Sequence, residues 1–242
     1  MVNLFFLVIM LLVIDCLMRL PTINSFWGIR RKTLLLSKTN GIIMDEKEKA
    51  WKTVSSKYLF RRPWLTVRCE DMLLPNGNHI PEYYILEYPD WVNTIAITKE
   101  GKFVFVRQYR PGVEKTCYEL CAGVCEKEDA SPLISAQREL WEETGYGKGN
   151  WQEYMVISAN PSTHTNLTYC FLATDVELID HQHLEATEDL SVHLLTLEEV
   201  RSLLDNNQIM QALNVAPLWK YMAALKLSLI HISEPTRQAE IS

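Results

Sequence analysis

Three carboxylates and one arginine stand close together in the segment RELWEE, which runs from Arg138 to Glu143. In an α-helix, with about 100° of turn per residue, Glu142 and Glu143 lie about 60° and about 40° to either side of Glu139. Like charges at this spacing repel one another, so the pattern predicts that a positive group binds there. Carboxylate oxygens suit Mg²⁺, with Mn²⁺ as the alternative, and Mg²⁺ in such sites usually also binds substrate phosphates. The sequence therefore predicts a metal–phosphate site.

The flanking residues predict where this helix begins and ends. Ser131 is a typical N-cap residue, Pro132 suits the first turn, and Gly145 suits the C-terminal end. Leu133 and Leu140 fall on a different arc from the carboxylates. One face of the helix can therefore pack on a core while another concentrates negative charge.

Strand-like segments lie on both sides of the helix. The pair Asn76-Gly77 between two apolar-patterned runs is a strong hairpin signal. The expected strands are residues 58–74 and 79–88 around that pair, 92–98 paired with 103–110, then 116–122, 152–159, 167–176 and 190–196. A polar loop, NPSTHTN, separates 152–159 from 167–176.

Two further helices are expected near the end of the chain. Thr196 and Glu199 have the spacing of a capping box and predict a helix over residues 196–207. A last helical piece spans residues 209–226, where Pro217 is expected to interrupt it. Many strands with a few helices, the first in mid-chain, indicate a layered α+β domain.

Composition limits the class of partner. The 242 residues are 48% hydrophobic, which is ample for a large core, and the net charge is −6. This charge argues against a nucleic-acid partner, whose phosphates are bound through Lys and Arg. Three of the six cysteines, Cys117, Cys121 and Cys125, recur every fourth residue, but no CxxC pair or nearby histidine completes a zinc site. Buried free thiols are expected, which favours a reducing, cytoplasmic compartment.

The two ends of the chain do not fit the domain. Residues 4–14 form an apolar run that is too short to span a membrane, and Met44 opens a polar segment that leads into the first strand. We interpret residues 1–43 as an upstream extension from a misplaced start, with a signal or membrane anchor as the alternative. Residues 227–242 resemble the translation of a sequencing adapter. The functional domain is therefore expected within residues 44–226.

The carboxylate helix and the glycine before it resemble the signature of the Nudix hydrolases, GX5EX7REUXEEXGU, in which U is apolar. The corresponding residues are Gly123, Arg138, Glu139, Leu140, Glu142, Glu143, Gly145 and Tyr146. One extra residue stands between Gly123 and Arg138, so the early acidic position falls on Glu128 or Asp129.

Segments outside the signature resemble the ADP-ribose pyrophosphatases of this family. They are VRQYRPG at 106–112, YELCAG at 118–123, and Pro161, sixteen residues after Gly145. The resemblance covers most of residues 54–205. It implies an α/β/α sandwich of the Nudix type with a mixed central sheet, a small N-terminal antiparallel sheet that includes residues 54–88, and a homodimer.

The resemblance also implies which residues hold the metal. Glu139 and Glu143 are the first expected ligands, Glu142 is the third, and the backbone carbonyl of Ala122 completes the set. Arg138 is expected to hold one of the carboxylates in place. A cation in this site neutralises pyrophosphate charge and orients an attacking water.

The general base is expected outside the signature, because the metal occupies its glutamates. The loop NPSTHTN lacks the glutamate that many ADP-ribose enzymes place there, so Glu185 and Glu188 in HLEATEDLS are the candidates. The candidate substrate contacts are Arg107, Arg110, Glu119 and, by stacking on adenine, Trp64. Arg107 and Arg110 are expected to point to opposite faces of their strand or to diverge at its end, so that only one of them contributes.

The expected activity is metal-dependent hydrolysis of ADP-ribose to AMP and ribose 5-phosphate. Dinucleoside polyphosphates, NADH and nucleotide sugars are the alternative substrates. The alternative from another class is a non-catalytic Nudix-like nucleotide sensor, but this signature retains its carboxylates.

Overall fold

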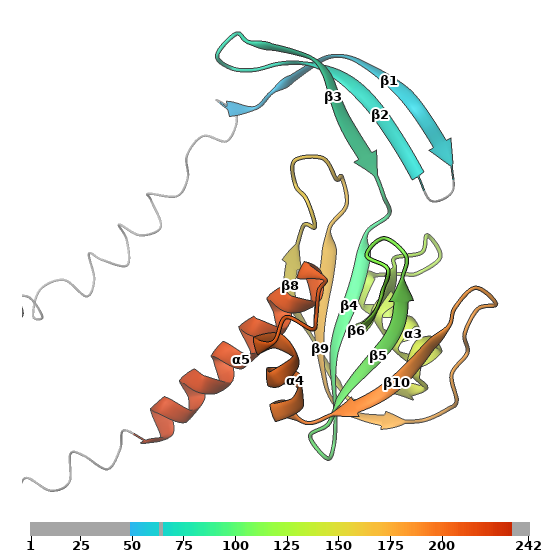
Figure 1. The fold of residues 1–242 in the computed structure, drawn as a ribbon, viewed down its shortest axis with the longest axis vertical. Helices are drawn as coiled ribbons and strands as arrows, with labels where there is room; N and C mark the ends of the chain where they lie inside the picture. Colours follow the sequence, from blue (N-terminus) through green and yellow to red (C-terminus); the bar gives the residue numbers. More distant parts are fainter. Residues whose placement is uncertain (1–48, 63–64, 234–242) are drawn as a thin grey trace, which may run out of the picture. The chain divides into compact units, whose positions relative to one another are not determined.

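The computed structural model of the chain describes residues 49–62 and 65–233 (Figure 1). The predicted extension over residues 1–43, the predicted stacking residue Trp64 and the chain beyond Ser233 lie outside the described residues.

The N-terminal strands form a sheet of their own. Its three antiparallel strands, in the order β1-β2-β3, are β1 (Lys52–Arg62), β2 (Leu65–Leu73) and β3 (His79–Glu87). The predicted hairpin joins β2 to β3, where Gly77 has a φ of 84° and donates its N–H to the Leu74 carbonyl at 3.0 Å. The expectation of one strand over residues 58–74 is wrong, since β1 and β2 divide it. Pro63, which has no backbone N–H, stands between them in the sequence.

The central sheet has seven strands. They are β4 (Trp91–Thr98), β5 (Phe103–Arg110), β6 (Lys115–Val124), β7 (Tyr146–Gly147), β8 (Asn150–Ile157), β9 (Thr168–Leu178) and β10 (Leu190–Leu195). Their order is β10-β5-β6-β4-β9-β7, and β8 also pairs with β9. β4 and β9 are parallel, with Trp91 opposite Thr168, whereas the other pairs are antiparallel. The sheet is therefore mixed, as predicted.

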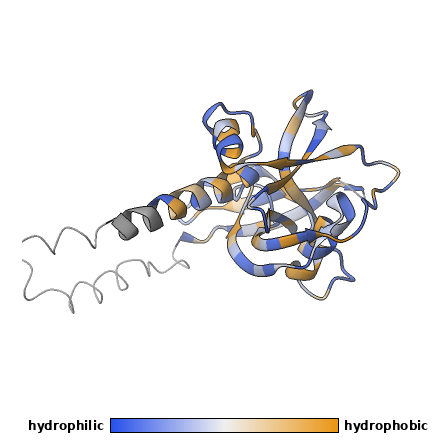
Figure 2. Cartoon of the chain, turned by 90° about the horizontal axis from the view of Figure 1, so that it is seen from below, coloured by the Kyte–Doolittle hydropathy of each residue, from blue (hydrophilic) through white to orange (hydrophobic). Residues whose placement is uncertain are grey.

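Helices cover both faces of this sheet (Figure 1). Because side chains alternate along β5, Val104 joins a core cluster with Leu140 of α3 (Pro132–Thr144). Phe105 points the other way, into a cluster with Val200 of α4 (Leu197–Asp205) and Leu218 of α5 (Ala212–Ser233). Figure 2 shows the hydrophobic colour concentrated on the strands between these layers. This is the α/β/α arrangement expected from the sequence.

The predicted helix ends of α3 and α4 are confirmed. The Ser131 side chain accepts a hydrogen bond from the backbone N–H of Ile134, and Gly145 ends α3 in the left-handed region with a φ of 74°. Thr196 and Glu199 form the reciprocal capping box that begins α4. Ser131 and Gly145 thus fix the two ends of α3, the helix that carries the carboxylates.

The expected break at Pro217 does not occur, because α5 continues through it from Ala212 to Ser233. A proline leaves the carbonyl four residues earlier without its helical donor, here that of Leu213. The buried side chain of Asn93, on β4, donates its Nδ2 to this carbonyl at 2.7 Å. The sheet therefore supplies the hydrogen bond that the proline removes.

The five cysteines among the described residues are free, and Cys117, Cys121 and Cys170 are buried. Among the described helices, none combines the length and the apolar character needed to cross a membrane.

Candidate active site

The carboxylates of α3 lie against the end of strand β6. Glu143 is buried, with 4% of its surface exposed, and its Oε2 accepts the backbone N–H of Ala122 at 3.2 Å. Glu139 is mostly buried and Glu142 is about one-third exposed, with side-chain exposures of 13% and 33%. The three predicted carboxylate ligands therefore run from the interior to the surface beside Ala122, whose carbonyl is the fourth predicted ligand.

Gly123 makes this close approach possible. A Cβ atom placed on Gly123 would lie 2.0 Å from the carboxyl carbon of Glu139, closer than any real contact allows. The glycine of the signature thus leaves the space that the Glu139 carboxylate occupies.

Arg138 connects the acidic residues around the helix. Its Nη1 lies 3.0 Å from Oε1 of Glu139 and 2.9 Å from Oε2 of Glu142. Its Nη2 donates to the Val124 carbonyl and to Oδ2 of Asp129, both at 3.0 Å. The guanidinium fork is pre-organised for such a set of bonds, so it holds both carboxylates in position.

The early acidic position is occupied by Asp129 in the structure. The hydrogen bond from Arg138 lowers the pKa of Asp129 below its ordinary value, which keeps the carboxylate charged. Glu128 is exposed. Of the two residues that the extra position left open, Asp129 is thus the one that bonds to the arginine.

The electrostatics of the cluster fit a cation. The pKa of Glu143 is raised to about 8, chiefly by burial and also by the nearby charges of Glu139 and Glu188, against the opposing hydrogen bonds from Cys121 and the Ala122 backbone. Burial also raises the pKa of Glu139. Both pKa shifts arise because the carboxylates are poorly solvated and lie close together. A bound divalent cation would offset their mutual repulsion and the cost of burying their charge. Oxygen-only donors favour Mg²⁺ or Mn²⁺ over softer metals.

A pocket of about 580 Å³ opens beside these residues. Ala122 and Gly123 border it, and Arg110 and Glu119 also line it. Pockets for small molecules commonly have this size and combine apolar walls with a few placed polar groups. The carboxylate cluster and the pocket thus share the Ala122–Gly123 backbone.

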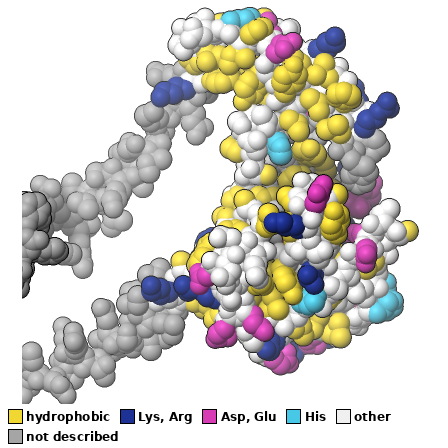
Figure 3. Space-filling view, in the orientation of Figure 1, with side chains coloured by type: hydrophobic (Ala, Val, Ile, Leu, Met, Phe, Trp, Pro, Cys, Tyr) yellow, Lys and Arg dark blue, Asp and Glu magenta, His cyan; other side chains and the backbone are white. Residues whose placement is uncertain are grey.

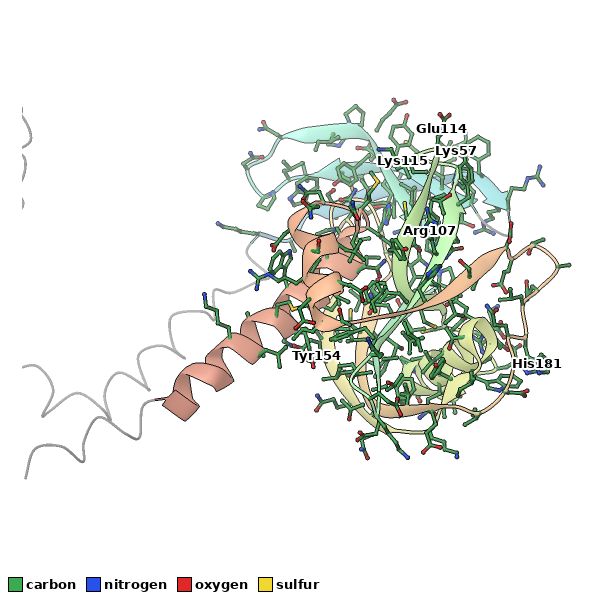
Figure 4. The ribbon with its side chains drawn as sticks, turned by 60° about the horizontal axis from the view of Figure 1, so that its bottom comes forward. Lys57, Arg107, Glu114, Lys115, Tyr154 and His181 are labelled. Carbon is green, nitrogen blue, oxygen red and sulfur yellow. The ribbon has the colours of Figure 1, made fainter. Side chains whose placement is uncertain are left out.

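Of the two predicted arginines, only Arg110 reaches this pocket. Its Nε donates to the buried Glu119 carboxylate at 2.9 Å, and Gln108 Nε2 lies 3.3 Å from the same carboxylate. Arg107 lies on the opposite face of β5, with its guanidinium 5.4 Å from the centre of the Tyr118 ring (Figure 4). The alternation expected along this strand is confirmed.

The two candidate bases lie in the irregular segment between β9 and β10. Glu185 and Glu188 are both exposed, and the backbone N–H of Glu185 donates to Oε2 of Glu188 at 2.9 Å. Of the two, Glu188 is the one whose charge contributes to the raised pKa of Glu143. The segment therefore brings Glu188 within electrostatic reach of the cluster.

Three polar residues in the pocket lining were not predicted from the sequence. Asn93, Thr168 and Asn214 line the pocket, and all three are buried. Among the described residues, Oδ1 of Asn93, Oδ1 of Asn214 and Oγ1 of Thr168 have no hydrogen-bond partner. Asn93 interrupts the apolar strand VNTIAIT, and that polar residue in a buried strand was the available signal.

Two protein-family models match adjacent parts of the chain. Residues 51–86 match the nucleoside diphosphate sugar hydrolase N-terminal domain, and residues 88–213 match the NUDIX domain. An ADP-ribose pyrophosphatase of Bacillus subtilis is 30% identical over 162 residues, which are 66% of this chain and 86% of that protein. A methanol dehydrogenase activator of Bacillus methanolicus is 30% identical over 159 residues, 65% of this chain and 85% of that protein.

A solved structure of an ADP compounds hydrolase has the same fold. It superimposes with a TM-score of 0.65 at 22% identity and covers 74% of this chain and 96% of that one.

Proposed function

Since the chain belongs to the Nudix hydrolase family, we propose that it hydrolyses the pyrophosphate bond of ADP-ribose and releases AMP and ribose 5-phosphate. The observation that carries this proposal is the shared backbone at Ala122–Gly123, with the carboxylate cluster on one side and the pocket on the other. A diphosphate at this point has a cation site beside it and room for the attached groups. The relative named ADP-ribose pyrophosphatase supports the choice of substrate.

In this proposal Glu139, Glu142, Glu143 and the carbonyl of Ala122 hold Mg²⁺, with Mn²⁺ as the alternative. The cation supplies charge neutralisation at the pyrophosphate and orients the attacking water. Arg138 positions Glu139 and Glu142 through its two short hydrogen bonds.

The remaining roles fall to residues around the pocket. Arg110, held by Glu119, is placed to bind phosphate or ribose oxygens through charge-assisted bonds. Glu188 is the proposed base that accepts the proton of the attacking water, since its charge reaches Glu143, and Glu185 is the alternative. Arg107 and Trp64 have no assigned role in this scheme.

The test is a hydrolysis assay of the full chain with Mg²⁺ over ADP-ribose, NADH, a dinucleoside polyphosphate and nucleotide sugars, with the products identified by chromatography. ADP-ribose is expected to give the highest kcat/KM, with AMP and ribose 5-phosphate as products. Preference for another member would reassign the substrate. Binding without hydrolysis of any member would indicate a nucleotide sensor instead.

A second candidate is a broader activity on nucleoside diphosphate sugars. It is favoured by the match of residues 51–86 to the N-terminal domain of nucleoside diphosphate sugar hydrolases. The same assay separates the two candidate activities. If the broader activity is correct, a nucleotide sugar is hydrolysed to a nucleoside monophosphate and a sugar phosphate at a rate comparable to that of ADP-ribose.

We further propose a cytoplasmic homodimer with no nucleic-acid partner. The N-terminal sheet exposes Val54, Tyr58, Leu59 and Phe60, and Figure 3 shows hydrophobic side chains gathered on it. The free thiols favour a reducing compartment. The net charge of −6 argues against nucleic acid. Light scattering after gel filtration should give twice the mass of one chain, and a single-chain mass would contradict the dimer.

A further inference from the structure

We propose that Asp180, His181 and His183 form a second metal site, which binds a divalent transition metal of the Zn²⁺ type. Each residue offers one ligand atom, and these atoms all lie within 4.8 Å of one another. Nδ1 of His181 is 2.7 Å from Oδ1 of Asp180, and Nε2 of His183 is 2.9 Å from Oδ2. Figure 4 shows His181 on the outside of the domain, beside α3.

The donor set defines the metal class. Two imidazole nitrogens and one carboxylate oxygen suit Zn²⁺, Ni²⁺ and Cu²⁺, whereas Mg²⁺ prefers oxygen donors alone. With metal–ligand distances of about 2.0–2.2 Å, tetrahedral Zn²⁺ requires donors about 3.3 Å apart. The two histidine–aspartate distances, 2.7 and 2.9 Å, are slightly shorter than this, and no pair of ligand atoms is more than 4.8 Å apart, so side-chain rotation would have to bring the three donors to equal spacing. The cluster and the carboxylates of α3 should therefore select different metals.

Two of the three ligands are held in place by the end of α3. The backbone N–H of His183 donates to the Glu142 carbonyl at 2.8 Å, and that of Asp180 donates to the Gly145 carbonyl at 3.1 Å. The imidazole of His183 stacks on Trp141 with ring centres 4.1 Å apart. The side chains of Asp180 and His181 are exposed, but the backbone is fixed at Asp180 and His183, so the segment loses less conformational freedom when a metal binds.

The position of the cluster also favours a positive charge. It adjoins the C-terminal end of a 13-residue helix, and no basic residue stands in the last turn of that helix. The C-terminus of a helix carries partial negative charge, which stabilises cations nearby. A bound cation would supply the positive charge that the sequence does not provide there.

The test is calorimetric titration of the full chain with ZnCl₂ in excess MgCl₂, repeated on Glu139→Gln to weaken binding at the carboxylates of α3. One binding event is expected to persist in Glu139→Gln. Since even outer-shell partners of a metal ligand change affinity by about 10–100-fold, loss of a ligand in His181→Ala should weaken this event by more than about tenfold. His181 has 78% of its side chain exposed, so the variant should fold normally.

His193→Ala is the matched control, because it removes an imidazole from β10 and leaves the cluster and all cysteines intact. It should bind Zn²⁺ as the unmodified chain does. Co²⁺ provides an independent measurement, since its visible absorption bands should appear with the unmodified chain and vanish with His181→Ala. Unchanged Zn²⁺ affinity in His181→Ala, or loss of the event in Glu139→Gln, would overturn the proposal.

Discussion

The α-carbon of Gly123 faces the carboxylate of Glu139 so closely that a Cβ atom there would stand 2.0 Å from the carboxyl carbon. Because Gly123→Ala must displace this predicted ligand, and a shift of about 1 Å can cost about 100-fold in rate, we expect kcat/KM to fall about 100-fold. Steady-state kinetics with ADP-ribose, together with the melting temperature, would measure this. A folded variant with unchanged activity would show that Glu139 need not occupy that place.

Glu143→Gln separates metal binding from folding. The change keeps the volume of the side chain but removes a carboxyl group whose ionisation burial disfavours, so the metal-free variant should be at least as stable as the original. Mg²⁺ should raise the melting temperature of the unmodified chain, since a ligand that binds the folded state stabilises it. That increase and the activity should both be lost in Glu143→Gln. An equal Mg²⁺ effect in both proteins would contradict the assignment of Glu143 as a ligand.

Asp129→Asn should weaken the network around Arg138, whereas Glu128→Gln should not. The charged hydrogen bond between Asp129 and Arg138 predicts a loss of about 1.5–3 kcal/mol in the free energy of unfolding. Because the folded-state pKa of Asp129 is lowered, its contribution is present above the unfolded value of about 3.9 and disappears as the pH falls through the folded value. Denaturation at pH 7 and below pH 4 would measure both effects. A similar loss in Glu128→Gln would contradict the pairing.

The sequence was sufficient to predict the carboxylate helix because its determinants are local. Ser131 and Gly145 fix its ends through bonds to residues a few positions away. Helical spacing alone then brings Glu139, Glu142 and Glu143 to one side. The hairpin at Asn76-Gly77 was predictable for the same reason, since its geometry depends on two adjacent residues.

The errors and omissions involve contacts between residues far apart in the chain. Pro217 was expected to break α5, because the donor that compensates for it belongs to Asn93, more than a hundred positions earlier. The pocket lining brings Asn93 of β4 together with Thr168 of β9 and Asn214 of α5. A local sequence pattern cannot show that these three residues come together in the fold. The division of residues 58–74 is the exception, because Pro63, which is a local signal, stands between β1 and β2 in the sequence.

The hydrogen bond from Asn93 to the Leu213 carbonyl predicts that a second substitution, at Pro217, compensates for the loss of Asn93. Asn93→Ala leaves this carbonyl without a donor, which should cost about 1–3 kcal/mol in the free energy of unfolding. Pro217→Ala restores a backbone N–H at the helical position for the same carbonyl. The double variant should therefore lose less stability than Asn93→Ala alone. Urea denaturation of the two single variants and the double variant would measure their free energies of unfolding. If the change in the double variant equals the sum of the changes in the two single variants, the proposed compensation is contradicted.

Glu188→Gln and Glu185→Gln test the proposed base as a matched pair. Both residues are exposed and lie three positions apart in one segment, so neither change should alter the melting temperature. A general base contributes about 100- to 10,000-fold to the chemical step, so kcat for ADP-ribose should fall by at least about 100-fold in Glu188→Gln. KM should change little, because the base acts in the transition state and adds little to substrate binding. Glu185→Gln should retain most of kcat, since Glu188 is the residue whose charge reaches Glu143. The reverse result would make Glu185 the base, and near-normal turnover in both would place the base outside this segment.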